Sequence, residues 1–425
     1  NMDTTVSAGT DFFRYACGGW NDAHPLTAEY SRYGTFDELF ENSQKQLREL
    51  IEGLAAQKNN QAGSAAQKIG DLYNMAMDSV TLNKQGAEPV KAMLDKIAGM
   101  KDKSEIVPMM TEMAHIGIGT YFRSYVYADP KNSSLNIFQM GQGGINLGEK
   151  EYYLDTDSIT QNIREQYKLY IGKLFQLAGF SEADAQQKVA DVMEIETAIA
   201  KVSRSATELR DPEANYHKMS FDELKKTISG IDWDAYMKGL GIQVPAELNV
   251  EQVEPIQEVA RLMNTLPLSK HVSYLEYNLL DAAASCLSDD FVAARFDFYG
   301  KVLSGRQVNQ PRWKRAVNSV NGMLGELVGE MYVEKYFPAA AKERMVKLVK
   351  NLQTALGERI DAQEWMSDST KIRAHEKLAA FHVKVGYPDK WKDYSKLEIK
   401  NDSYWANVCR ASEWGFNDMY SRIGK

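Results

Sequence analysis

The histidines of this 425-residue chain are the side chains best suited to bind a metal, and their spacing decides whether they can. His375 is followed at once by Glu376, as in the H-E-x-x-H motif, where two histidines on one helix face share a zinc ion and the glutamate is the general base. The second histidine of the motif would be residue 379, which is Ala379, and the next histidine is His382. Along a helix those two rings lie about 10 Å apart, whereas zinc needs each ligand at about 2 Å. We therefore expect no zinc site here and interpret the stretch as a solvated helix.

The other residues that could carry chemistry form no recognised site either. No two of the six histidines lie three or four residues apart. The cysteines Cys17, Cys286 and Cys409 are far apart in the sequence, form no C-x-x-C pair and allow at most one internal disulfide. The glycine-rich run that begins at Gly141 fails the dinucleotide-binding pattern G-x-G-x-x-G, because its sixth position is Asn146.

Two pairs of nearby carboxylates leave acid–base chemistry open. We interpret Glu194 with Glu196, and Asp289 with Asp290, as solvated charges of helices or loops, and general acid–base catalysis is the alternative. The sequence also lacks the G-x-S-x-G turn of serine hydrolases and the phosphate-binding G-x-x-x-x-G-K-[S/T] loop. Residue types and spacing alone thus predict a helical protein without a complete active site.

Helical periodicity dominates the elements that would have to position these residues. In residues 36–54 the apolar side chains follow one stripe and the charges lie opposite. One region differs, because two β-rich runs flank the turn residues Asp129 to Asn132 and predict a hairpin. We therefore expect a mainly α fold, a large multi-helix domain with a small β-hairpin element near 119–140. Further helices are expected at 65–82, 88–99, 104–116, 159–178, 182–203, 253–264, 270–303, 311–336, 341–365 and 368–384.

Composition narrows the possible partners. The chain is 44% hydrophobic and 25% charged, as soluble globular proteins are, and its length predicts two domains or one large helical assembly. A net charge of -8 argues against nucleic acid as the main partner. No apolar run approaches the roughly 18 residues of a membrane span, so we expect no transmembrane segment.

Several stretches, in order along the chain, resemble the neprilysin and endothelin-converting-enzyme family of zinc metallopeptidases. The opening carries the clearest of them, in Asp11-Phe12-Phe13, Gly18-Gly19-Trp20 and Ser31-Arg32-Tyr33-Gly34. The resemblance spans residues 2 to about 397. Its further matches are "GEKEYY" at 148–153, Arg210-Asp211-Pro212, Arg312-Trp313 with Asn321, Glu364-Trp365-Met366, and Gly386-Tyr387-Pro388-Asp389 with Trp391.

This resemblance implies that the catalytic metal site lies outside the chain. In the family the H-E-x-x-H helix and the third zinc ligand belong to the C-terminal part, beyond the position of Lys425. The chain is therefore similar to the N-terminal, mostly helical portion of such an enzyme. That portion faces the catalytic part across a closed cavity and admits peptides while excluding folded proteins. Zinc is the implied cofactor, with no ligand in this chain.

The resemblance also implies a division of the chain. Residues 1–40 would pack on the catalytic part and line the substrate cleft, 41–400 would form the helical substrate-gating domain, and 401–425 would lead back into the catalytic part. We expect aromatic residues at both ends to be exposed for that contact. They are Phe12, Phe13, Tyr15, Trp20, Tyr33, Phe36, Trp405, Trp414, Phe416 and Tyr420.

Three residues match positions that line the family's substrate cleft. Arg32 matches an arginine that contacts the primed side of the peptide, Phe36 an aromatic wall of the pocket there, and Asp37 its polar neighbour. Phe40 stands where neprilysin has a second arginine, which favours general endopeptidase action over release of dipeptides. The alternatives are a surface or interdomain salt bridge for Arg32 and core packing at the start of a helix for Phe36.

The implied partners are the C-terminal catalytic half of the same enzyme and peptide substrates. The small number of cysteines favours a bacterial, extracytoplasmic protein, which is periplasmic, attached to the outer membrane or secreted.

A second hypothesis stays open, in which the chain is a non-catalytic helical binding module that never meets a zinc domain. An H-E-x-x-H sequence in the gene beyond Lys425 would favour the first hypothesis.

Overall fold

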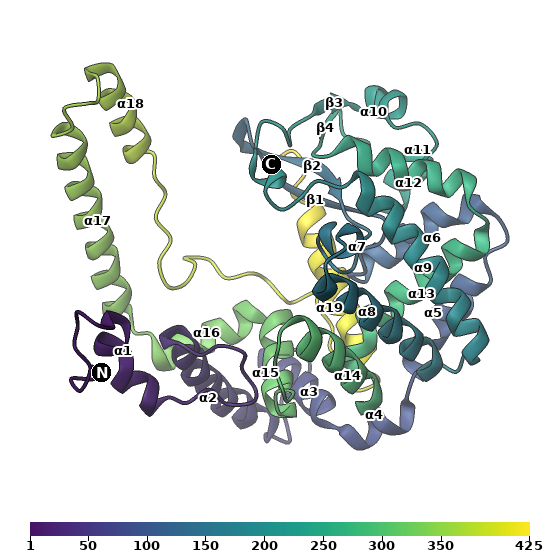
Figure 1. The fold of residues 1–425 in the computed structure, drawn as a ribbon, viewed down its shortest axis with the longest axis horizontal. Helices are drawn as coiled ribbons and strands as arrows, with labels where there is room; N and C mark the ends of the chain where they lie inside the picture. Colours follow the sequence, from purple (N-terminus) through teal and green to yellow (C-terminus); the bar gives the residue numbers. More distant parts are fainter.

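The computed structural model describes residues 1–425 and shows a mainly α fold with one small sheet, as the sequence predicted (Figure 1). The strands are β1 (Phe122–Asp129), β2 (Asn132–Gln142), β3 (Lys218–Ser220) and β4 (Glu247–Val250). The helices are α1 (Phe12–Ala23), α2 (Thr35–Ala55), α3 (Ala65–Met77), α4 (Ser79–Gln85), α5 (Glu88–Ala98), α6 (Ile106–His115), α7 (Glu151–Leu154), α8 (Ser158–Leu177), α9 (Glu182–Val202), α10 (Phe221–Thr227), α11 (Trp233–Gly239), α12 (Val253–Thr265), α13 (Leu268–Ala283), α14 (Asp289–Arg295), α15 (Arg312–Met323), α16 (Gly325–Tyr336), α17 (Ala339–Asp361), α18 (Asp368–Ala379) and α19 (Tyr404–Tyr420), with a π-helix at Phe296–Leu303.

The predicted hairpin is confirmed and forms one side of a four-stranded sheet. Strands β1 and β2 pair antiparallel, with Val126 opposite Phe138. Strand β4 pairs parallel to β2, and β3 antiparallel to β4, so the strand order is β1-β2-β4-β3. The last residue of the chain joins this region, because the Asn136 N–H donates to the Lys425 carbonyl at 2.9 Å.

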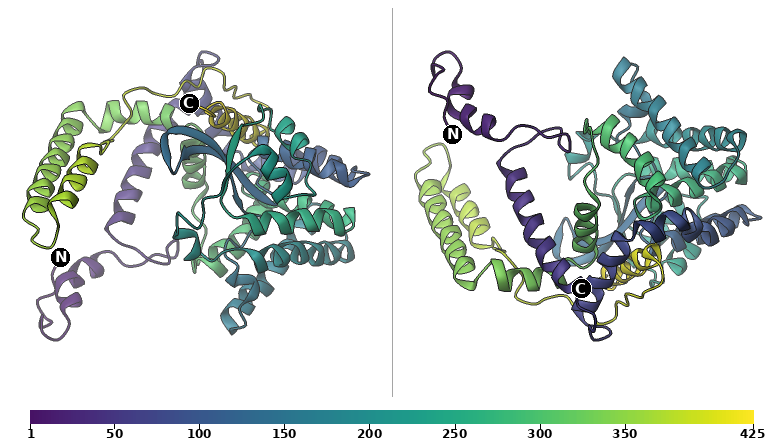
Figure 2. Two further views of the ribbon diagram at one scale, coloured as in Figure 1. Left: turned by 90° about the horizontal axis from the view of Figure 1, so that it is seen from above. Right: turned by 90° about the horizontal axis from the view of Figure 1, so that it is seen from below.

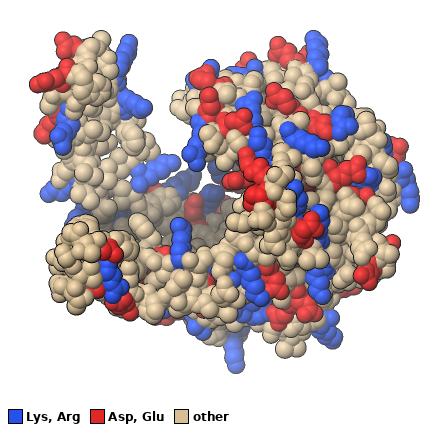
Figure 3. Space-filling model, viewed as in Figure 1, with Lys and Arg blue, Asp and Glu red and all other residues tan.

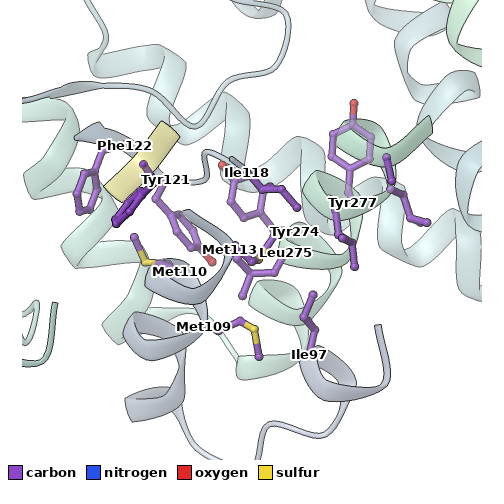
Figure 4. Close-up of a cluster of buried hydrophobic side chains, with 14 of the residues drawn as sticks. Ile97, Met109, Met110, Met113, Ile118, Tyr121, Phe122, Tyr274, Leu275 and Tyr277 are labelled. Atoms are coloured by element: carbon purple, nitrogen blue, oxygen red, sulfur yellow. The ribbon is translucent and has the colours of Figure 1, made fainter. Parts of the chain in front are cut away.

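A single large core holds the helices together. Its centre is α13, which packs on α5, α8 and α9 and buries Tyr274, Tyr277 and Leu280 completely. Figure 4 shows methionines of α6, among them Met113, directed toward the rings of Tyr121 and Tyr274. Burying an aromatic side chain of this size removes on the order of 150–250 Å² of surface from water. The aromatic residues of α13 therefore join helices that lie far apart in the sequence.

The C-terminal helix belongs to this core, which corrects one sequence expectation. We expected Trp405, Phe416 and Tyr420 to be exposed for a catalytic part, and the structure buries all three. Helix α19 packs on α6, α3 and β1, and the Tyr420 hydroxyl hydrogen-bonds Ser124 at 2.8 Å. Trp414 is half-buried and stacks on Tyr394 with ring centroids 4.3 Å apart. These rings therefore serve the helical body itself.

The residues that stand apart are those of α17 and α18. We call residues 339–381 the arm, because the two helices pack mainly on each other and project from the helical body (Figures 1 and 2). No residue of the arm is buried. Helix α18 ends at Ala379, so His382 lies outside it, and the solvated helix expected through 384 is shorter than predicted.

Candidate functional site

The turn that carries Arg32 ends in a capped helix start. Gly34 is extended and precedes α2, and the Asp37 carboxylate accepts a hydrogen bond from the Gly34 N–H at 2.9 Å. A carboxylate in the first turn also interacts favourably with the helix dipole. Asp37 therefore fixes the angle at which residues 31–34 enter α2, and its predicted role beside the substrate stays a prediction.

Arg32 and Phe36 are both presented to solvent. Phe36 is 87% exposed, which excludes core packing within this chain as the reason for its presence. Arg32 is exposed and forms no ion pair or side-chain hydrogen bond with any other residue of the chain. Its five guanidinium donors are thus available to a partner outside the chain. Leu39 and Phe40 extend the same exposed apolar surface along α2.

A buried lysine tethers this turn to the helical body. Lys314 of α15 is almost fully buried and donates to Glu29 at 2.8 Å and to Glu41 at 2.6 Å, while the Tyr30 hydroxyl also donates to Glu41. Burial alone would lower the pKa of Lys314, but these hydrogen bonds outweigh it and raise the pKa. Lys314 therefore stays charged and links the two sides of the turn to α15.

A second tether joins the turn to the loop after the π-helix. The N–H groups of Gln307 and Val308 both donate to the Ala28 carbonyl, at 2.9 and 3.1 Å. With the lysine contacts these bonds hold residues 28–41 against the body on both sides of Arg32. The Arg32 side chain has no partner in the chain, whereas the backbone on either side of it is held by these contacts.

An extended apolar surface lies on the arm and the N-terminal segment. Along α17 the residues Met345, Leu348, Leu352 and Leu356 follow the spacing of one helix face, and each is more than 40% exposed. The space-filling view shows the molecule deeply hollowed between the arm and the body (Figure 3). The other large exposed apolar residues of the arm and of residues 1–40 are Met2, Phe12, Phe13, Leu26, Phe36, Leu39, Phe40, Trp365, Ile372 and Phe381. Contiguous apolar patches beyond a few hundred Å² mark interaction sites.

The residues of the chain do not fit a zinc site. No group of three or more His, Cys, Asp or Glu side chains lies close enough together to hold a metal ion. His375 instead faces Asp361 across the arm, with its Nε2 2.7 Å from a carboxylate oxygen. His271 is fully buried, and its ring nitrogens lie 2.6 Å from the Tyr121 hydroxyl and 3.2 Å from a backbone carbonyl.

One carboxylate was misjudged from sequence. Glu196, expected to be solvated, is completely buried and accepts hydrogen bonds from Tyr153 at 2.6 Å, Asn146 at 2.7 Å and Tyr167 at 2.9 Å. Burial raises its pKa to about 7, although all three donors oppose the shift. Tyr153 is the last residue of "GEKEYY", so this stretch joins α7, α8 and α9 in a buried polar network. A glutamate flanked by Val192, Ile195 and Ile199 on one helix face was the sequence signal for its burial.

None of the helices is both long enough and apolar enough to span a bilayer.

Comparison with known proteins confirms the family that the sequence resemblance predicted. The model of the N-terminal domain of peptidase family M13 matches residues 8–388, and the chain belongs to this family. Endothelin-converting enzyme 1 of Rattus norvegicus is 29% identical over 424 residues, which cover 96% of this chain and 54% of that protein. Human membrane metallo-endopeptidase-like 1 is 26% identical and is matched over 56% of its length. The chain thus spans about half the length of these curated relatives.

Solved structures agree with this assignment. The inhibitor complex of the Mycobacterium tuberculosis zinc metalloprotease ZMP1 is 31% identical and superposes with a TM-score of 0.93 over 99% of this chain and 64% of that one. PepO from Lactobacillus rhamnosis is 19% identical and superposes with a TM-score of 0.85 over 97% of this chain and 66% of that one, which shows the shared fold.

Proposed function

We propose that the chain is the substrate-gating and cleft-lining part of a zinc-dependent metalloendopeptidase that hydrolyses peptides. Its H-E-x-x-H zinc site would lie on a catalytic half that follows Lys425. Family membership and the roughly half-length match to full enzymes support this proposal. The chain alone is then inactive, because it has no group of side chains that could hold the metal.

The observation that carries the proposal is the apolar face of the arm. A helix with an apolar stripe is stable in water when another element covers that stripe, and the stripe from Met345 to Leu356 is left 42–61% exposed in this chain. Phe12, Phe13 and Phe36 of the N-terminal segment add further exposed apolar surface that a partner could cover. A catalytic half seated between these surfaces would bury both and would enclose the hollow beside the helical body.

Within that enclosed cleft, Arg32 would bind the primed side of the peptide. A guanidinium fork pairs with a carboxylate or a peptide carbonyl through two hydrogen bonds, and Arg32 has no competing acid within the chain. Phe36, four residues further along the chain, would form an apolar wall for the adjacent side chain. Asp37 would contribute by holding the turn in place through its cap on Gly34.

Co-expression tests the partner. The gene segment that follows Lys425 is expressed with this chain, and we expect the two halves to co-purify and to show chelator-sensitive peptidase activity that neither half shows alone. Replacing Leu348 and Leu352 with Ser should prevent co-purification while the chain stays folded, because both side chains are already solvated in it. Two soluble halves that never associate, or a stop codon directly after Lys425, would favour the non-catalytic binding module.

The Arg32→Met substitution tests the substrate contact in that complex. Loss of charge-assisted hydrogen bonds of about 1.5–3 kcal/mol predicts a fall in kcat/KM of roughly ten- to hundredfold. The fall should be larger for peptides with a free carboxylate just past the cleaved bond than for their amides. Arg261→Met, on the remote α12, is the matched control because Arg261 pairs with Glu258 at the surface. Unchanged kcat/KM on both peptide forms would show that Arg32 does not bind substrate.

The proposed location is extracytoplasmic, in the bacterial periplasm, at the outer membrane or in the medium. Cell fractionation of the native organism with an antibody against this chain tests it directly.

A further inference from the structure

An arginine-rich cavity lies in the helical body, away from the arm. It has a volume of about 510 Å³, is partly open to solvent and is lined mainly by α14, the π-helix, α15 and the start of α19. Its walls contain Arg295, Arg306, Arg312 and Arg315 and not one acidic residue. Protein sites for small organic ligands have volumes of about 300–1,000 Å³, so the cavity has room for more than a single ion.

Only two of the four arginines are neutralised. Arg295 pairs with Asp281 at 2.8 Å, and Arg312 pairs with Asp289. Arg315 has no carboxylate partner, and its Nε donates only to a backbone carbonyl at 3.2 Å. Arg306 also lacks an ion pair, and its guanidinium lies 5.6 Å from the ring centre of Phe296. The cavity wall therefore carries about two uncompensated positive charges.

The positive charge of Arg315 is only partly compensated within the chain. Burial, together with the nearby charge of Arg312, lowers the pKa of Arg315, and the charge of Asp289 opposes this shift only in part. An anion between Arg306 and Arg315 would neutralise their positive charge. It would also accept hydrogen bonds from both guanidinium groups. Packing within the chain supplies no such group, because no acidic residue lines the cavity.

Neutral hydrogen-bonding groups complete the lining. The hydroxyls of Ser319 and Tyr404 lie 2.5 Å apart at the wall, and the Asn309 and Asn318 amides line the same space. Hydroxyl and amide groups can donate to the remaining oxygens of a phosphoryl or carboxylate group. The lining thus combines two free cations with donors for an oxyanion and leaves space for a small organic body beside it.

We propose that this cavity binds a small, doubly charged oxyanion, an organic phosphate or a dicarboxylate. Arg306 and Arg315 bind the charged group, and Ser319, Tyr404 and the two amides orient it. The site also neighbours the turn that carries Arg32. Gln307 and Val308, which follow Arg306, donate backbone hydrogen bonds to the Ala28 carbonyl. An occupant would therefore brace the loop that fixes this turn.

Calorimetry on the 425-residue chain tests the proposal with three probes at constant ionic strength: inorganic phosphate, glycerol 3-phosphate and succinate. We expect saturable binding of at least one probe with a Kd near or below about 1 mM. Preference for the phosphates or for succinate identifies which oxyanion source the site takes. Binding of none of them up to about 10 mM would overturn the proposal.

Substitutions separate a ligand site from a structural charge cluster. Arg306→Gln and Arg315→Gln should each weaken probe binding at least about tenfold. Arg315→Gln should also leave the Tm of the ligand-free chain unchanged or raised, because it removes an uncompensated charge. Arg261→Gln is the control for the loss of one surface charge, and equal weakening by this control would refute a defined site.

Chemical modification provides a readout that needs no variant. Phenylglyoxal modifies accessible arginines, and the modified positions are mapped by mass spectrometry. Saturating glycerol 3-phosphate should slow modification of Arg306 and Arg315 and leave Arg32, which lies outside the cavity, unchanged. Equal modification rates with and without the probe would contradict the proposal.

Discussion

Replacing Glu196 with Gln should change how the stability of the chain depends on pH. The carboxyl is completely buried and its pKa is raised to about 7, against an ordinary value of 4.5. Between those two values the folded chain holds a proton that the unfolded chain has released. The free energy of unfolding therefore falls as pH rises through this window, and the contribution of the protonated carboxyl is lost above about pH 7.

The size of the effect follows from the shift. One pKa unit corresponds to about 1.36 kcal/mol, so the raised pKa predicts that Glu196 contributes about 2.5 kcal/mol less to stability at pH 8 than at pH 5. Glutamine has nearly the same shape and is neutral throughout. Its amide oxygen can accept from Asn146, and the hydroxyls of Tyr153 and Tyr167 can turn to accept from its NH2 group.

Urea unfolding at pH 5, 6, 7 and 8, followed by circular dichroism, measures the difference between the wild-type and Glu196→Gln chains. Other titrating groups contribute equally to both chains and cancel in this difference. Glu194→Gln, which removes a carboxylate from the solvent side of the same helix, is the matched control. A wild-type minus Glu196→Gln difference that stays constant from pH 5 to pH 8 would refute the reasoning, since it would mean that the buried carboxyl does not titrate in this range.

Three further changes test other parts of the structure by thermal or urea unfolding. Lys314→Met should destabilise the chain by about 2–3 kcal/mol, because the buried Glu41 loses its charged donor, and adding Glu41→Gln should recover part of the loss. Phe416→Ala should cost about 3–5 kcal/mol because the ring is buried, whereas Phe36→Ala should cost less than about 0.5 kcal/mol; equal losses would contradict the assigned burial. Trp365→Ser should leave the Tm of the chain unchanged but weaken association with a co-expressed catalytic half, and a clear loss of Tm would place this exposed ring in the fold itself.

Most helices could be predicted because their apolar residues repeat with the period of a helix. The predicted ranges 88–99, 182–203 and 253–264 agree with α5, α9 and α12 to within a residue. The single helix expected at 270–303 is instead divided, because Leu287 and Ser288 are extended and α14 starts anew after them. A short extended break inside a continuous apolar run leaves almost no trace in periodicity.

Short strands and the final helix escaped prediction for different physical reasons. Strands β3 and β4 have three and four residues, too few for alternation to be visible, and they form because the edge of β2 is available for pairing. For α19, composition showed an aromatic-rich segment but not its partner. An aromatic helix face can pack equally well on the helical body or on a separate catalytic half. Only the tertiary contacts of α19 with α6 and β1 show that it packs on the body.

The residues of the candidate site could be predicted only because the sequence around them resembles a known family. Arg32 and Phe36 are exposed, as residues of a cleft must be, but their contact with substrate stays a prediction. Local sequence could not reveal the tether through Lys314, because its partner Glu29 lies 285 residues away. The same is true of the arginine-rich cavity, whose walls come from seven separate helical segments and the loop of Arg306 and Asn309.

The position of α19 in the core also sets the order in which the body can form during synthesis. The ribosome releases α16, then the whole arm, and only afterwards the helix that packs on α3, α6 and β1. A nascent chain is extended by roughly 5–20 residues per second, so about 15–60 s pass between the emergence of α6 and that of α19. In the last part of this interval the apolar face of the arm and the unfinished core are exposed together. The period before α19 emerges is therefore when the nascent chain most needs protection from aggregation, and a truncation before residue 404 should yield insoluble protein even though it removes only the end of the chain.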